Sequence, residues 1–239
     1  TMTALQQQLN YDEDIVKQRV AEARFLRAFN FFKLVQVFGG VPKVDHILTS
    51  EEYNMPRSSV AEILDLVKSD LIKAIPDLLL KSELGDANIG RASKGAAQSL
   101  LAKAYLFESS YATNYAGDER FTGCEVNWDS VNYWAEEVIA SGEYALVGLN
   151  GERFESWRDP VNGVGGYYHI FSPRANNCEE SIFDIQSRQD GLGWFYSRGT
   201  ALIRWCAPRF TYQPITPGGE YVSTEGPGWG WWVPSQQLE

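Results

Sequence analysis

The chain has 239 residues, a hydrophobic content of 44% and a formal net charge of −10 at pH 7. The acidic balance argues against a nucleic-acid partner, because phosphates are repelled, and no apolar stretch is long enough to cross a bilayer as a helix. A chain of this size forms one large domain or two smaller ones.

The first predicted helix covers residues 11–38, which contain neither glycine nor proline. Gly39, Gly40 and Pro42 follow it as a stop signal, because glycine adopts the left-handed cap conformation and proline cannot continue a helix. Four phenylalanines cover more than half of its circumference, which predicts neighbours on several sides. We expect core positions for Phe25, Phe29, Phe31 and Phe32. The helix's arginines are expected to stack on rings or pair with acidic partners.

Three further helices are predicted before residue 142. The second begins at Ser59 and extends to about Leu80, with Pro76 ending or kinking it. The third covers residues 93–110, where alanines and a glycine allow a partner helix to approach closely. The fourth covers residues 129–140 and ends just before Gly142.

These patterns predict a mainly α fold of tetratricopeptide-like antiparallel helix pairs over residues 1–142. The third and fourth helices form the clearest pair, with residues 111–127 as an interhelical loop. We see no clean self-repeat of about 34 residues, the length typical of that motif. Trp128 and Trp134 begin or line the fourth helix and are expected to belong to the scaffold.

The second part, residues 143–239, is predicted to be loop-rich and irregular, and to form the ligand-binding part of the same domain. Helical periodicity stops near Leu146, and only residues 181–186, SIFDIQ, alternate as a strand does. Residues 191–239 hold five of the eight tryptophans. Such a composition is typical of ordered loops rather than disorder, and binding residues are often on such loops.

Nothing in the sequence predicts catalysis, a metal or a cofactor. His46 and His169 have neither metal-ligand spacing nor a nucleophile motif beside them. The acidic pairs are adjacent residues, which do not face each other on a helix, so they are not predicted as an acid and base pair. Residues 85–90, GDANIG, lack the spacing of a calcium loop. Three separated cysteines, Cys124, Cys178 and Cys206, give no metal motif and leave one unpaired.

Ligand binding is better supported than catalysis. Aromatic rings offer rigid apolar surfaces that the C–H faces of a sugar can cover, and neighbouring polar side chains can bond its hydroxyls. Residues 190–205 and 226–234 combine tryptophans with glycines, which leave the rings accessible. The alternative is that these tryptophans fill the core of the loop-rich part. The predicted ligand-binding residues are Trp194, Tyr196, Arg198, Trp205, Tyr212, Trp229 and Trp231.

Four segments, in chain order, resemble signatures of the SusD-like (RagB/SusD) family of nutrient-binding proteins. They read EARFLRAFNFFKLVQVFGGVP, RASKGAAQSLLAKAYLF, NNCEESIFDIQ and WVPSQQLE. The last looks like the first turn of a helix capped by Ser235. The resemblance therefore covers a middle portion of such a protein, and we expect the chain to be part of a longer one.

The resemblance implies a cell-surface protein that is not an enzyme. Similar proteins are lipid-anchored on the outer face of the outer membrane of Bacteroidetes-type bacteria, and cover a SusC-like TonB-dependent transporter. They capture oligosaccharides, and in some branches peptides. For this chain the implied partners are an oligosaccharide or polysaccharide and such a transporter, with the lipid anchor outside the chain. Two alternatives remain open, namely peptide capture and a structural transporter lid without its own ligand site.

Overall fold

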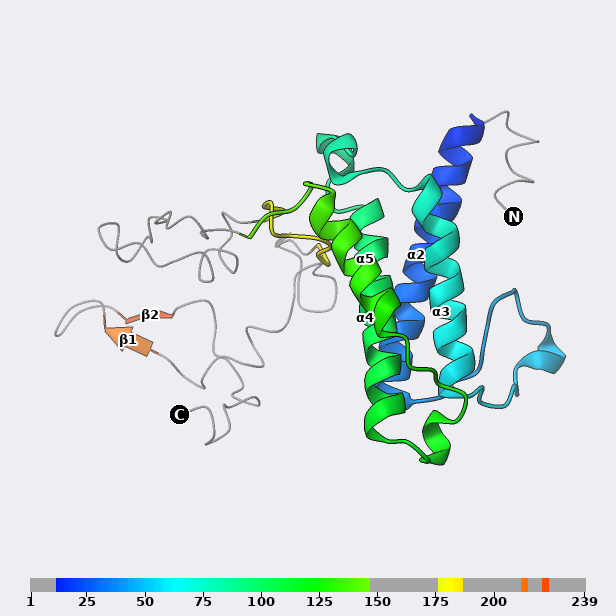
Figure 1. The fold of residues 1–239 in the computed structure, drawn as a ribbon. Helices are drawn as coiled ribbons and strands as arrows, with labels where there is room; N and C mark the ends of the chain where they lie inside the picture. The colour runs from blue at the N-terminus through cyan, green and yellow to red at the C-terminus, as the bar shows by residue number, and fades with distance from the viewer. Residues whose placement is uncertain (1–11, 147–175, 187–211, 215–220, 224–239) are drawn as a thin grey trace. The chain divides into compact units, whose positions relative to one another are not determined.

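The computed structural model describes residues 12–146 and 176–186, together with the backbone of two short strands. The chain divides into two compact units, residues 1–184 and 185–239, which are considered separately. In the second unit, β1 (Tyr212–Pro214) and β2 (Tyr221–Ser223) form an antiparallel pair in which Gln213 lies opposite Val222. Figure 1 shows these elements in the colours of the sequence.

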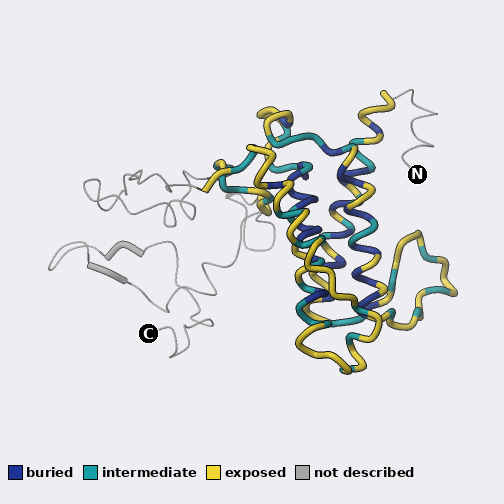
Figure 2. The backbone as a smooth tube through the Cα atoms, viewed as in Figure 1, coloured by how far each residue is buried: buried dark blue, intermediate teal, exposed yellow. Residues whose placement is uncertain are grey.

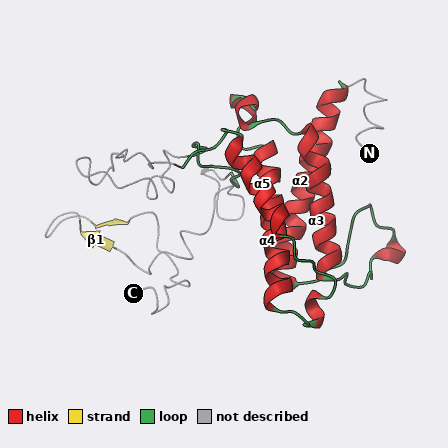
Figure 3. Cartoon of the chain, in the orientation of Figure 1, coloured by secondary structure: helices red, strands yellow, loops and turns green. Residues whose placement is uncertain are grey.

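Four α-helices make up most of the described part of the first unit, which confirms the mainly α prediction (Figure 3). They are α2 (Glu13–Phe38), α3 (Val60–Ala74), α4 (Lys94–Asn114) and α5 (Trp128–Ala140). Helices α2 and α3 pack as one antiparallel pair and α4 and α5 as the next, with α3 against α4 (Figure 1). Short 3₁₀ turns lie between them, at Ser50–Glu52, Ile75–Asp77, Lys81–Glu83, Asp86–Asn88 and Glu119–Phe121.

Side-chain caps begin each helix, because the first backbone N–H groups have no partner inside the helix. Ser59 accepts from the N–H of Glu62, and the Glu62 carboxylate accepts from the Ser59 N–H at 2.7 Å, which completes a capping box. Ser93 caps α4 by accepting from the N–H of Ala96, and Asn127 caps α5 by accepting from the N–H of Ser130. At the other end of α2, Gly39 has φ 68° and its N–H reaches Val35 O, which confirms the predicted stop.

Two helix ends differ from the prediction. Helix α3 ends at Ala74 rather than near Leu80, because Pro76 has no N–H and its ring cannot follow a regular helical turn. Helix α4 runs past residue 110 to Asn114, which shortens the predicted loop. The Tyr111 ring lies 4.5 Å from Phe107 and 4.6 Å from Phe121 between centroids, and these contacts favour the extra turn.

The strand prediction for residues 181–186 is wrong, because these residues are irregular in the structure. A strand needs a neighbouring chain to accept and donate backbone hydrogen bonds. Here the carbonyl of Ser181 accepts instead from the side chain of Lys81, at 2.7 Å. Of the apolar residues in the segment, Phe183 lies against the core, whereas Ile182 is 37% and Ile185 77% exposed.

The phenylalanines of α2 lie in the core, as predicted. Phe25 and Phe32 are each 1% exposed, Phe31 is also buried, and Phe29 is half-buried. Figure 2 shows the buried positions where the helices face one another. Arg27 pairs with the buried Asp70 at 2.6 and 2.7 Å, which confirms an acidic partner for an arginine of this helix. The core also contains Ile63, Leu64, Val67, Leu71, Ala97 and Leu101.

The two tryptophans assigned to the scaffold both lie on α5. Trp134 packs against the core, and Trp128 opens the helix and is 43% exposed. Within the described residues, no helix combines the length and the apolar character that a membrane crossing requires.

Candidate functional site

A cavity of about 450 Å³ lies beside the helical core, within the first unit. Three parts of the chain line it, namely residues 81–93 between α3 and α4, residues 142–143 after α5, and residues 177–184. Its volume is in the range of small-molecule sites. The lining residues used below are Lys81, Leu84, Asp86, Ile89, Arg91, Glu143, Glu179, Ile182, Phe183 and Asp184.

Lys81 joins two walls of the cavity. Its Nζ donates to the carbonyl oxygens of Cys178 at 2.6 Å and Ser181 at 2.7 Å, and lies 5.1 Å from the centroid of the Tyr144 ring. We call this set of contacts the Lys81 bridge. Burial lowers the pKa of Lys81, while the carboxylates of Asp184, Glu179 and Glu143 raise it in part. The bridge holds residues 178–181 against a segment about a hundred positions earlier in the chain.

Tyr144 is held by α4. Its hydroxyl and the Ser93 Oγ are 2.8 Å apart, and its ring covers Gly95. A Cβ at Gly95 would lie 2.4 Å from a ring carbon, closer than any real contact, so a larger residue at this position would have to displace the Tyr144 ring. Burial raises the pKa of Tyr144, which keeps the phenol protonated at neutral pH.

Two further contacts fix the loops around the Lys81 bridge. The carboxylate of Glu143 accepts from the N–H and the hydroxyl of Ser82, at 2.8 and 2.9 Å. The N–H of Ala145 donates to the Glu179 carbonyl at 3.3 Å. These bonds tie the chain after α5 to both of the other lining segments.

Phe183 connects the third wall to the hydrophobic core. Its ring centroid lies 4.8 Å from that of Phe25 and 5.5 Å from that of Phe29, both at edge-to-face angles. Aromatic pairs in this geometry add to the stabilisation from buried area. One wall of the cavity is therefore attached to α2.

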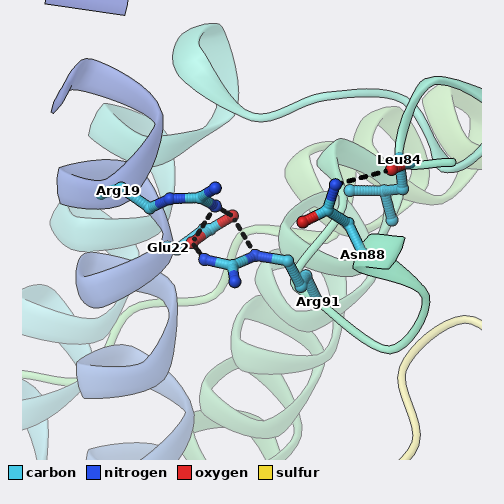
Figure 4. A network of polar contacts seen from close by, with 5 residues as sticks. All are labelled: Arg19, Glu22, Leu84, Asn88 and Arg91. Carbon is cyan, nitrogen blue, oxygen red and sulfur yellow. Dashed lines mark hydrogen bonds and ion pairs between the residues drawn. The ribbon is translucent and has the colours of Figure 1, made fainter. Parts of the chain in front are cut away.

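Arg91 enters the cavity lining from a network that crosses to α2, shown in Figure 4. Its Nε donates to Glu22 at 2.9 Å and its Nη2 to the other oxygen, while Arg19 donates to both oxygens at 2.8 and 3.0 Å. Burial alone would raise the pKa of Glu22, but the bonds from Arg91 and Arg19 outweigh it, and the pKa lies below the ordinary value. Asn88 donates to Leu84 O at 3.0 Å and holds the adjoining turn (Figure 4).

The arrangement is suited to non-covalent binding. Aliphatic and aromatic side chains lie beside carboxylates, an arginine and a lysine. Across the part of the chain that the structure describes, no three His, Cys, Asp or Glu side chains are grouped to hold a metal. Burial raises the pKa of Cys124 to about 11, so its thiol is a weak nucleophile at neutral pH. His46 contacts Asp45 and Glu52 in the loop between α2 and α3, outside the cavity lining.

The ligand-binding residues predicted from the sequence lie outside the described side chains. Six of them, Trp194, Tyr196, Arg198, Trp205, Trp229 and Trp231, fall in stretches that the structure does not describe, and Tyr212 is described only as backbone in β1. Their role stays a prediction. Sequence reasoning missed the cavity, because its walls come from three distant segments. Two of the three segments carry a sequence signal, but not one for a cavity. Residues 85–90 resemble a calcium loop without its spacing, and residues 176–186 contain a strand-like alternation and a family signature.

Comparisons with known proteins agree on one family. A family model for SusD-like proteins, described as starch-binding and associating with the outer membrane, matches residues 2–106. SusD-like protein P38 from Formosa agariphila is 27% identical over 172 residues, covering 65% of this chain and 32% of that protein.

Two solved structures give the same picture. A SusD-like carbohydrate-binding protein from Bacteroides fragilis matches with a TM-score of 0.56 and 26% identity, over 74% of this chain and 28% of its own. Surface glycan-binding protein A from Bacteroides fluxus matches with a TM-score of 0.59 and 25% identity, over 92% of this chain and 39% of its own. The chain thus spans well under half the length of each relative.

Proposed function

We propose that the chain belongs to the SusD-like family, and that it is part of a cell-surface protein that captures oligosaccharides and delivers them to a SusC-like TonB-dependent transporter. The observation that carries the proposal is the match to a carbohydrate-binding protein and a surface glycan-binding protein over most of this chain. A helical scaffold bearing a cavity suited to non-covalent binding supports it.

Capture requires no covalent step, so the protein is proposed to bind and release its ligand unchanged. The tryptophans and tyrosines of residues 194–231 would cover the C–H faces of sugar rings, and Arg198 would bond hydroxyls. Affinity then comes from a few stacked rings offset by the cost of ordering a flexible ligand. Modest affinity suits a protein that must pass its ligand on.

The proposed location is the outer face of the outer membrane, with a lipid anchor outside residues 1–239. The description of the matching family model, which associates with the outer membrane, supports this location. Treatment of intact cells with an added protease tests it. Loss of the protein from intact cells supports surface exposure, and survival until the outer membrane is opened contradicts it.

The function is tested with full-length protein on native gels that contain different soluble polysaccharides. One or more glycans should retard the wild type, and Trp194→Ala, Trp205→Ala and Trp229→Ala combined should reduce the retardation. Trp128→Ala is the matched control, because this exposed tryptophan opens α5 and is not among the predicted ligand contacts.

The outcomes separate the alternatives. Unchanged retardation in the triple variant would remove these tryptophans from the site. If no glycan retards the wild type while peptides from a protein digest bind, peptide capture replaces glycan capture. If neither ligand binds but the protein still co-purifies with the transporter, a structural lid is the better description.

A further inference from the structure

We propose that the cavity beside the Lys81 bridge is a second sugar-binding site, lined by residues other than the predicted aromatic contacts, and that it takes one or two neutral sugar units. This inference rests on the proposed function, since it assumes that the protein meets glycans. All residues that line the cavity lie within residues 81–184, in the first compact unit. The predicted aromatic contacts lie in the second.

The apolar part of the lining offers surfaces for the C–H faces of a sugar. Ile89 is 49% exposed and Ile182 37% exposed, although both are large aliphatic side chains. Phe183 adds an aromatic ring whose edges are already positioned by Phe25 and Phe29. Leu84, which is buried, also belongs to the lining.

The polar part of the lining favours a ligand that supplies hydrogen-bond donors. Asp86, Glu143, Glu179 and Asp184 bring four carboxylates, against two cationic side chains. Both cations are engaged, Lys81 with two carbonyls and Arg91 with Glu22 through Nε and Nη2. Glu143 already accepts from Ser82 and Asp184 already accepts from Ser181, but a carboxylate oxygen can accept more than one hydrogen bond, and a neutral polyol presents an O–H donor at nearly every carbon.

The walls are held before any ligand arrives. The Lys81 bridge fixes residues 178–181, Ser82 binds Glu143, and Arg91 is set by its two-point contact with Glu22. Each contact joins segments far apart in the sequence, so the lining does not depend on one flexible loop. A site that is ordered in advance loses less entropy when it binds a ligand.

The test uses full-length protein and saturation-transfer NMR with a set of neutral mono- and disaccharides, including the disaccharide of any polysaccharide that retards the wild type on gels. The Trp194→Ala, Trp205→Ala, Trp229→Ala variant should still show transfer to at least one sugar. Adding Ile89→Trp, which fills the cavity from a half-exposed position, should reduce that signal to the level of a blank without protein.

Ile72→Trp is the matched control, because Ile72 is 46% exposed on α3 and does not line the cavity. Added to the same triple variant, it should leave the transfer signal unchanged. Thermal unfolding of all variants shows whether a loss of signal reflects a loss of folding, and Ile89→Ser gives a second variant that removes the apolar contact without adding bulk.

Four results would overturn the inference. Loss of all transfer in the triple tryptophan variant would show that the cavity binds no sugar, while the proposed function would stand on the tryptophans. Full retention after Ile89→Trp would show that the sugar binds outside the cavity. Transfer only to glucosamine, abolished by salt, would assign the cavity to cationic ligands instead. If the wild type binds no sugar in any experiment, the proposed function itself fails, and the inference with it.

Discussion

The four helices and residues 176–184 reach their positions by different physical routes. The helices begin at side-chain caps and end at glycine or proline signals that lie within a few residues of each end. Residues 176–184 have no regular structure, and they are held by Lys81 and by the rings of Phe25 and Phe29. Local rules therefore describe the first region, while the second depends on partners about a hundred or more residues away.

Phe25 lies on α2 and its ring contacts Phe183, so it supports both regions. Its loss should therefore have the largest effect on stability. Phe25→Ala should cost about 3–5 kcal/mol, because it leaves a cavity in the core and removes the contact to Phe183. Chemical denaturation measures the free energy of unfolding. Phe38→Ala, on an exposed position of the same helix, is the control and should change little. Equal losses would mean that α2 is not packed as described.

The Glu22 network should give the next largest effect, and it depends on pH. Glu22→Gln should cost about 2–3 kcal/mol at pH 7, since Arg19 and Arg91 lose their carboxylate. The pKa of Glu22 is lower in the folded state than the ordinary 4.5. Its contribution is therefore complete above about pH 4.5 and is lost as the pH falls through the folded value.

This prediction is checked by comparing the wild type and Glu22→Gln in denaturation curves from pH 7 to pH 3. The difference in stability between them should shrink on the acid side. A difference that stays constant with pH would show that the carboxylate is not ionised and paired in the folded protein.

Lys81→Met should affect the two regions differently. The substitution keeps the apolar stem but removes both bonds to the carbonyls of Cys178 and Ser181, so residues 178–184 should loosen while the helices remain. Hydrogen exchange of backbone amides should rise there about tenfold or more, which corresponds to about 1.4 kcal/mol or more of local opening. Lys73→Met, at an exposed position on α3, is the control. Exchange that rises equally in α2 would contradict independent loosening.

The smallest effect is expected at a helix cap. Ser59→Ala removes the side-chain acceptor for the Glu62 N–H and should destabilise α3 by about 1 kcal/mol. Ser58→Ala is a close control, because Ser58 bonds to Val41 O through its backbone N–H, which the substitution retains. Thermal melts of both variants measure the difference, and the same melting temperature for the two would show that the cap contributes nothing.

The sequence was sufficient for the helices because their signals are local. Ser59, Ser93 and Gly39 act within one turn of the chain, and their positions could be predicted without knowing the fold. Pro76 predicts that the helix ends or kinks nearby. It does not predict that the helix ends at Ala74, because that end depends on the 3₁₀ turn at Ile75–Asp77.

The cavity could not be predicted in the same way. Lys81 looks like any surface lysine in the sequence, and only the fold brings its Nζ to two carbonyls of residues 178–181. The alternation in residues 181–186 is typical of a strand, but here only Phe183 turns toward the core, while Ile185 is 77% exposed.

Gly95 has no Cβ, and this leaves room for the Tyr144 ring. The choice of residue at position 95 therefore limits which residues can be accepted at positions far from it in the sequence. Any side chain there would displace the Tyr144 ring, and that ring lies under the lysine that holds residues 178–181. Substitutions at positions 81, 95 and 144 are therefore expected to covary among homologues, so that a lineage retains or replaces the three together. In libraries of random variants, tolerance at position 95 should be lower than at any exposed position of α4.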